Sequence, residues 1–152
     1  MFSLTGKKVL LDEAAQRRIV DAIREAEQHT TGEIRVYAEP RCRYVDPMVR
    51  AAELFVRLKM DQTAARNAVI IYIAVDDREF ALYGDAGLHE KAGGADFWKA
   101  AARQLAGHLQ DKGLVEAICK CVYELGAALA QHFPHDPAVK KNELPDEIVF
   151  GK

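Results

Sequence analysis

Carboxylates at the ends of predicted strands are the residues of this 152-residue chain that could most readily perform chemistry. Asp76 and Asp77 directly follow the apolar segment AVIIYIAV, and Glu39 and Asp46 follow another predicted strand. Open α/β sheets usually bind ligands beyond the carboxyl ends of their strands, so we expect these side chains at one edge of a sheet. Carboxylate oxygens are hard ligands that favour Ca²⁺ or Mg²⁺. The alternative is that Asp76 and Asp77 are simply favoured hairpin-turn residues.

A second group of polar residues is expected at the opposite edge of the same sheet. Glu33 begins the first predicted strand, Asn67 precedes the second, and Asp85 follows a third strand that runs backwards. Two carboxylates with an amide could hold a cation. The alternative is that Glu33 and Asp85 accept hydrogen bonds from loop amides and that Asn67 caps a turn. The candidate metal ligands are therefore Asp76, Asp77, Glu33 and Asp85, and the candidate ligand-loop residues are Asn67, Arg78, Gly84 and Gly87.

The segment GDAGLHEKAGG, residues 84–94, is predicted to be a loop because it holds four of the ten glycines. Glycine permits positive φ angles and a close approach of the backbone, at a cost in chain entropy. We expect this loop to be the most mobile ordered segment and to become more ordered when a ligand binds.

Several familiar chemistries are excluded by residue types. The single serine, Ser3, cannot form the G-x-S-x-G elbow of serine hydrolases. The only Gly-Lys pair lacks the pattern of a phosphate-binding P-loop, and no HExxH zinc motif is present. None of the three cysteines, Cys42, Cys119 and Cys121, is followed by arginine at the spacing that clamps a phosphoryl group. We expect these cysteines to be buried thiols in a reducing compartment.

The composition is that of an ordinary folded domain. Hydrophobic residues make up 49% and charged residues 29%, and the length suits one domain. A net charge of -2 is too balanced for a general nucleic-acid binder. No run approaches about 18 uninterrupted apolar residues, and the N-terminus does not read as a secretory signal. We expect a soluble cytoplasmic protein without membrane insertion, with one domain over residues 1–134 and a polar tail over 135–152 that could dock on it.

Hydrophobic periodicity predicts the elements that must position these residues. The expected helices run from the Asp12 cap to about residue 29, from the Asp46-Pro47 cap to about residue 60, from the Asp96 cap to residue 112, and from Leu114 to about residue 133. The expected strands are residues 33–38, 68–75 and 79–83, and the second should be covered on both faces because it is continuously apolar.

This order of elements fits a small three-layer α/β domain, with a short mixed β-sheet and helices on both faces. The first two strands should be parallel through a right-handed crossover, and the hairpin makes the third antiparallel.

An ordered series of motifs along nearly the whole chain resembles the TPM domain family, which has thylakoid-lumen, photosystem-repair and receptor-modulating members. The motifs are Thr31-Gly32-Glu33-Ile34, Arg66-Asn67, Asp76-Asp77-Arg78, Gly84-Asp85-Ala86-Gly87-Leu88 and Asn142-Glu143-Leu144-Pro145-Asp146-Glu147-Ile148. The last motif is similar to that of a short bacterial branch. The chain departs from the commoner pattern of Gly, aromatic, Gly, because Asp85-Ala86 replaces the aromatic step.

The resemblance implies a small α/β sandwich and one of several roles: divalent-cation binding, acid phosphatase activity, or accessory roles beside membrane complexes. From it and the residues, the expected function is a non-enzymatic accessory module that binds Ca²⁺ or Mg²⁺ and an unidentified protein partner. The alternative is a metal-assisted acid phosphatase acting on phosphomonoesters.

Overall fold

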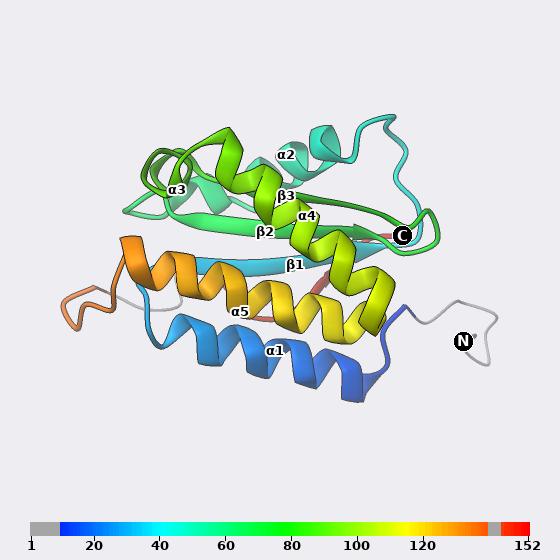
Figure 1. Cartoon of the computed structure of the whole chain (residues 1–152), viewed down its shortest axis with the longest axis horizontal. Coiled ribbons are helices and arrows are strands. Elements are labelled where there is room, and N and C mark those ends of the chain that lie inside the picture. The colour runs from blue at the N-terminus through cyan, green and yellow to red at the C-terminus, as the bar shows by residue number, and fades with distance from the viewer. Residues whose placement is uncertain (1–9, 140–143) are drawn as a thin grey trace.

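The computed structural model describes residues 10–139 and 144–152, which form an α/β domain (Figure 1). The helices among these residues are α1 (Glu13–Glu27), α2 (Pro47–Arg57), the short 3₁₀-helix η1 (Met60–Gln62), α3 (Ala86–Ala92), α4 (Ala95–Lys112) and α5 (Leu114–His132). The strands are β1 (Glu33–Glu39), β2 (Ala68–Ala74), β3 (Glu79–Gly84) and β4 (Val149–Phe150). The predicted caps of the first two helices are confirmed, since Asp12 accepts from Ala15 N–H and Asp46 from Met48 N–H.

The sheet is mixed and has the strand order β3-β2-β1-β4. Strands β1 and β2 are parallel, with Glu33 opposite Ala68 and Glu39 opposite Ala74. Strand β3 is antiparallel to β2, and β4 is parallel to β1 on its other side. The predicted parallel pair and hairpin are therefore confirmed, and the second edge of β1 is covered by the end of the chain.

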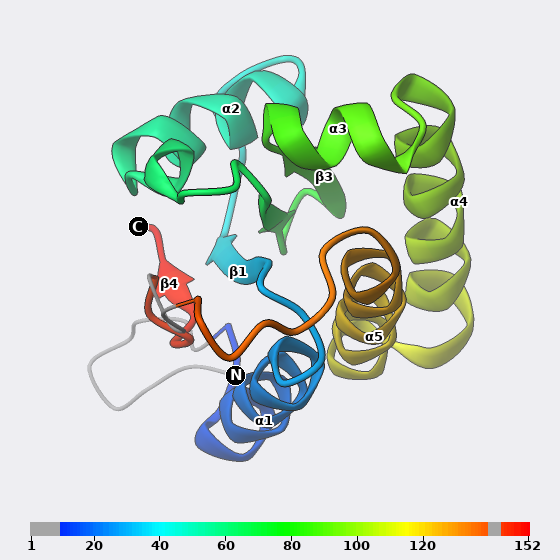
Figure 2. The ribbon, with the colours of Figure 1, turned by 90° about the vertical axis from the view of Figure 1, so that its left-hand side faces the viewer.

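Helices cover both faces of the sheet, as predicted (Figure 2). Helices α1 and α5 pack against each other on one face, with α4 along α5, and α2 covers the other face. All seven residues of β2 are buried, which explains why its sequence is continuously apolar. Val75, one residue past the strand, is only half-buried, so both faces of the chain are fully covered only over the paired residues of β2.

The predicted loop over residues 84–94 is wrong for its central part, which is helix α3. Asp85 caps this helix by accepting a hydrogen bond from Ala86 N–H, and Gly93 ends it with a φ of 112°. A Cβ on Gly87 would lie 2.4 Å from the carbonyl oxygen of Ala65, so this glycine permits a close approach rather than flexibility. Helix α4 correspondingly starts after Gly94, and Asp96 lies inside its first turn.

The cysteines are free thiols in two different environments. Cys119 and Cys121 are buried in α5, as predicted, and burial raises the pKa of Cys121 to about 12. Cys42 is only half-buried, because it lies in the loop between β1 and α2. None of the helices described for this chain is long and apolar enough to cross a membrane.

Candidate functional site

A cavity of about 530 Å³ lies where β1 ends, between α2 and the end of the chain. We call it the carboxyl-edge pocket. The end of the chain approaches its floor closely, since a Cβ on Gly151 would lie 2.6 Å from Glu39 Oε1. The residues that line the pocket are Tyr37, Glu39, Arg43, Tyr44, Arg50, Glu53, Arg57, Phe150, Gly151 and Lys152.

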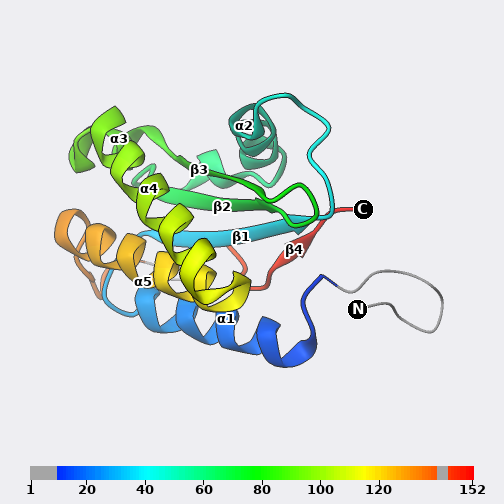
Figure 3. The ribbon, with the colours of Figure 1, turned by 45° about the vertical axis from the view of Figure 1, so that its right-hand side comes forward.

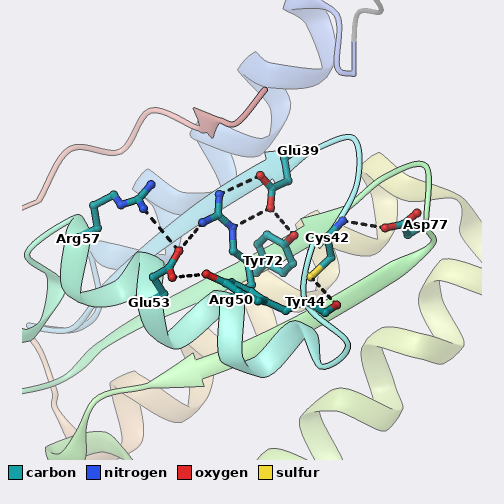
Figure 4. Close-up of polar contacts among 8 residues, drawn as sticks. All are labelled: Glu39, Cys42, Tyr44, Arg50, Glu53, Arg57, Tyr72 and Asp77. Carbon is teal, nitrogen blue, oxygen red and sulfur yellow. Dashed lines mark hydrogen bonds and ion pairs between the residues drawn. The ribbon is translucent and has the colours of Figure 1, made fainter.

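The floor of this pocket is a buried ion pair between Glu39 and Arg50 (Figure 4). Arg50 Nε lies 2.9 Å from Glu39 Oε2, and Arg50 Nη2 lies 3.0 Å from Oε1, so the contact is bidentate. The Tyr72 hydroxyl donates to Glu39 Oε2 at 2.5 Å. The hydrogen bond with Glu39 raises the pKa of Arg50 above its usual value, and burial, followed by this carboxylate, raises the pKa of Tyr72.

Arg50 also holds a second carboxylate, that of Glu53 one turn along α2. Arg50 Nη1 donates to Glu53 Oε1 at 2.6 Å, and the Tyr44 hydroxyl donates to Glu53 Oε2. The Tyr44 hydrogen bond, followed by Arg50, lowers the pKa of Glu53. Arg57 is a weaker partner, with Nη2 3.5 Å from Glu53 Oε1. Both carboxylates of the pocket are therefore already engaged by side chains of the protein.

The hairpin residues predicted to bind metal lie at the same edge but do not line the pocket. Asp77 Oδ2 accepts a hydrogen bond of 2.7 Å from Cys42 N–H, which ties the β1–α2 loop to the hairpin (Figure 4). The backbone N–H of Asp76 donates to the carbonyl of Pro40 at 2.7 Å. Both side chains are exposed, as is Arg78, which adopts a φ of 55° in the turn. This contact of Asp77 agrees with the alternative interpretation, in which Asp77 is a residue of the hairpin turn.

The opposite edge does not bring Glu33 and Asp85 together. Strand β2 lies between β1 and β3, so their backbones are separated by two strand spacings, about 10 Å. Asp85 is held by Arg66 through two contacts of 2.7 and 2.8 Å, in addition to capping α3. Asn67 Nδ2 donates to Thr31 Oγ1 at 3.2 Å. Gly84 packs under Trp98, whose ring would lie 2.2 Å from an added Cβ.

Glu33 instead belongs to a group of buried acids that we call the amino-edge carboxylates: Glu27, Glu33 and Asp146. Glu33 Oε1 accepts from Leu144 N–H at 2.6 Å, and Glu27 Oε2 accepts from Ile34 N–H at 2.8 Å. Burial raises the pKa of Glu27 to about 8 against the effect of the Ile34 hydrogen bond, and the nearby Asp146 and Glu33 add to the rise.

Two of these carboxylates have an oxygen that is buried without a hydrogen-bond partner, Oε1 of Glu27 and Oδ1 of Asp146. The side chains are 3% and 9% exposed. Arg24 Nε lies 3.5 Å from Asp146 Oδ2, and that arginine is mostly in solvent. Within residues 10–139 and 144–152, no three His, Cys, Asp or Glu side chains are arranged as a ready-made metal site.

Sequence reasoning missed Glu27 and Asp146 as a pair. A signal existed for Glu27, because it follows Ile19, Ile23 and Ala26 on the apolar face of α1, where an acid is out of place. Asp146 lies in the motif that closes the chain. Asn142 and Glu143 of that motif lie outside the described residues.

Comparison with known proteins finds a domain family and solved structures that are similar to this chain. A sequence model of the TPM domain matches residues 5–128. The NMR structure of BA42 protein from the psychrophilic bacterium Bizionia argentinensis is 34% identical, with a TM-score of 0.86 over 97% of this chain and 100% of that chain. The N-terminal domain of cg2496 from Corynebacterium glutamicum shares the fold, at 12% identity and a TM-score of 0.63 over 89% of this chain and 83% of that one. None of the curated proteins matches the chain. The chain therefore belongs to the TPM domain family.

Proposed function

We propose that this TPM domain is a non-enzymatic accessory module that binds a divalent cation, Ca²⁺ or Mg²⁺, at the amino-edge carboxylates. The observation that carries the proposal is that Glu27 Oε1 and Asp146 Oδ1 are buried without a donor from the protein, while the two side chains are close enough for a proton on Glu27 to bridge them. A buried carboxylate needs a partner charge, hydrogen bonds or a proton. The raised pKa of Glu27 indicates that a proton fills this role when no cation is bound.

A hard divalent cation is the ligand that best replaces such a proton, because Ca²⁺ and Mg²⁺ prefer carboxylate oxygens and complete their coordination with water. Metal binding at acidic groups releases protons, so the affinity should rise with pH up to the pKa of Glu27. Of the four metal ligands predicted from the sequence, Glu33 is one of the amino-edge carboxylates at which we propose that the cation binds. Asp77 and Asp85 are already engaged by Cys42 and Arg66.

The experiment is a titration of the uniformly labelled protein with CaCl₂ and separately with MgCl₂, followed by amide NMR. Saturable shifts should centre on Ile34, Leu144 and the residues beside Asp146. The Glu27→Gln, Asp146→Asn double variant should lose them, whereas the Asp76→Asn, Asp77→Asn double variant serves as the matched control and should keep them. Shifts that centre on the hairpin and vanish in the control variant would instead place the cation at Asp76 and Asp77.

The protein partner is proposed to dock on the outer side of α2. Val45, Val49 and Val56 are 101%, 54% and 62% exposed, an unusual set of apolar side chains for one short helix and the loop before it. A Val45→Asp, Val49→Asp variant should fail to retain a purified partner that the unaltered protein retains. Equal retention by both would move the docking surface elsewhere.

A metal-assisted acid phosphatase remains the second candidate, because Asp76 and Asp77 are exposed at the carboxyl ends of the strands, where a carboxylate could serve as base. Hydrolysis of an aryl phosphate should then be lost in the Asp76→Asn, Asp77→Asn variant. Unchanged hydrolysis by this purified variant would show that the hairpin does not carry the reaction.

A further inference from the structure

Strand β3 is an open edge of the sheet. The strand order ends at β3, and no other segment of the described chain pairs with it. Asp85 N–H donates to the carbonyl of Ala68, the residue that begins β2, at 3.0 Å, so every second residue back from Asp85 faces β2. The residues between them face the other way in an antiparallel ladder. The backbone N–H and C=O groups of Phe80, Leu82 and Gly84 therefore point to the open edge.

A cavity of about 470 Å³, which we call the β3-edge groove, adjoins the end of this edge next to α3. Figure 3 shows β3 as the outermost strand on its side of the sheet, with α2 on one side of it and α3 and α4 on the other. Leu82 lines the groove although it is only 3% exposed, and backbone polar groups at such a position need hydrogen-bond partners. The groove thus has room for a ligand that offers alternating donors and acceptors.

The side chains around the groove are aromatic and are held in place by the protein. Trp98 packs over Gly84, and its indole N–H donates to His89 Nδ1 at 3.0 Å. The centroid of the Tyr83 ring lies 5.0 Å from that of Phe55. Rigid aromatic side chains provide a large contact area at a small cost in conformational entropy. This part of the groove suits one large apolar side chain of a ligand.

The other end of β3 is negatively charged. The hairpin that leads into β3 contains Asp76, Asp77 and Glu79 against a single base, Arg78, and both aspartates are exposed. A strand rises about 3.4 Å per residue, so the hairpin end of β3 lies about 17 Å from Gly84. A strand added to β3 would thus place a side chain beside the hairpin about five residues from the side chain in the groove. A basic residue is favoured there by charge complementarity.

We propose that β3 accepts an extended peptide segment of a partner protein as an additional strand, with a large apolar side chain in the β3-edge groove and a basic side chain beside the hairpin acids. Hydrogen bonds to the backbone of Phe80, Leu82 and Gly84 supply affinity, and the two side chains supply selectivity. The site depends neither on a cation at the amino-edge carboxylates nor on docking to the outer side of α2.

The first test is amide NMR titration of the full chain with an acetylated and amidated peptide, Lys-Thr-Val-Thr-Val-Trp, and with the peptide of reversed order. Two orders are needed because an added strand can run in either direction. We expect saturable shifts at Phe80, Leu82 and Gly84 with at least one of them. The absence of saturable shifts with both peptides up to millimolar concentration would overturn the proposal.

Hydrogen exchange tests the open edge in the free protein. The N–H groups of Phe80, Leu82 and Gly84 should exchange at least about tenfold faster than those of Ala81 and Tyr83, which face β2, and should be protected in the complex. Equal protection in the free protein, together with dimerisation in sedimentation experiments, would assign this edge to a second copy of the chain and overturn the proposal.

Alternate N-methylation of the peptide distinguishes strand addition from general apolar contact. One form is methylated at the first, third and fifth residues, and the other at the second, fourth and sixth. Only alternate N–H groups of an added strand face β3, so one form should keep its affinity and the other should bind at least about tenfold more weakly. Equal affinities of the two forms would contradict strand addition.

Two exposed apolar residues of α2 provide matched variants. Met48 lines the groove and is 40% exposed, whereas Val56 is 62% exposed and does not line it, so both Met48→Asn and Val56→Asn should fold. Met48→Asn should weaken peptide binding at least about threefold because it loses apolar contact, and Val56→Asn should leave it unchanged. Equal effects of the two changes would show that the peptide does not occupy the groove.

The charge at the hairpin is tested with the Asp76→Asn, Asp77→Asn variant. It should bind the lysine peptide about twofold to fivefold more weakly, as expected for exposed charge pairs, and should bind a peptide with threonine in place of lysine unchanged. Equal weakening of both peptides would contradict the role of the basic residue. The Glu27→Gln, Asp146→Asn variant should bind the lysine peptide with unchanged affinity, so a failure of the cation proposal leaves this one standing.

Discussion

The two ends of strand β1 contain buried acids that are neutralised in opposite ways. At the carboxyl end, Glu39 is paired with Arg50 and accepts from the Tyr72 hydroxyl. At the amino end, Glu27 receives one backbone hydrogen bond, and the charged groups that shift its pKa are other carboxylates. At the carboxyl end, the negative charge of Glu39 is thus balanced by a side chain of the protein. At the amino end, the charge of Glu27 can be balanced only by a proton or a cation from the solution.

This difference predicts how each end responds to its surroundings. An arginine keeps its charge at every pH that a folded protein survives, so Arg50 should remain a charged partner of Glu39 at neutral pH. A carboxyl group with a pKa of about 8 changes its charge near neutrality. The comparison can be tested by removing the internal partner at one end and the titrating group at the other.

The largest effect is expected for Arg50→Met, which leaves Glu39 buried at 4% exposure without a cation. Breaking a buried pair in this way typically costs about 3–5 kcal/mol. Urea unfolding of the variant should show this loss in the free energy of unfolding. Adding Glu39→Gln to Arg50→Met removes the stranded charge and should recover most of it. A loss below about 1 kcal/mol would mean that the pair behaves like an exposed surface bridge.

The next effect, which appears only as pH rises, is expected for Glu27→Gln. The pKa of Glu27 in the folded protein is about 8, above its ordinary value of 4.5, so the folded state retains a proton that the unfolded chain releases. The stability that this proton provides is fully present below pH 4.5 and is lost as pH rises to about 8. The slope is at most about 1.4 kcal/mol for each pH unit.

The measurement is the difference in unfolding free energy between Glu27→Gln and the unaltered protein at several pH values, which isolates this group from the other acids. The difference should move in favour of the glutamine variant between pH 4.5 and about 8 and should be flat outside that window. A flat difference throughout would mean that Glu27 titrates normally and that the two ends of β1 are alike.

The smallest effect is expected for Asp85→Asn, which sharpens the comparison within the amino edge. Asparagine caps a helix as well as aspartate does, so α3 should remain capped. The weakened contact is with Arg66, whose side chain is 53% exposed although Asp85 itself is buried, so the loss of stability should be smaller than for either change above. The affinity for Ca²⁺ should be unchanged. A strong loss of Ca²⁺ binding would return Asp85 to the metal site predicted from the sequence.

The sequence predicted the elements that local patterning specifies. The period of α1, the continuous apolar stretch of β2 and the caps Asp12 and Asp46 each act over a few residues, and the structure has them as expected. Helix α3 was missed because a helix of seven residues is marginal alone and depends on the contact that Gly87 makes with residues 65–66. Local patterns carry no information about such contacts.

The candidate site was predicted only in part for the same reason. Carboxylates were expected at both edges, and both edges have them. The proximity of Glu27 to Asp146 arises only because the end of the chain returns to β1 as β4. The pairing of Glu39 with Arg50 likewise depends on how α2 lies on the sheet. Neither of these two pairings has a spacing that the sequence alone could reveal, whereas Arg50 and Glu53 are three residues apart on one helix, a spacing that favours contact.

The central claim is that a divalent cation replaces a proton at Glu27 and Asp146. Calorimetric titration with CaCl₂ at pH 7, repeated in buffers of different ionisation enthalpy, counts the protons released on binding. With the pKa of Glu27 at about 8, the account predicts release of about one proton per bound ion, and none from the Glu27→Gln variant at whatever affinity remains. Ca²⁺ binding without proton release, or equal release by the variant, would contradict it.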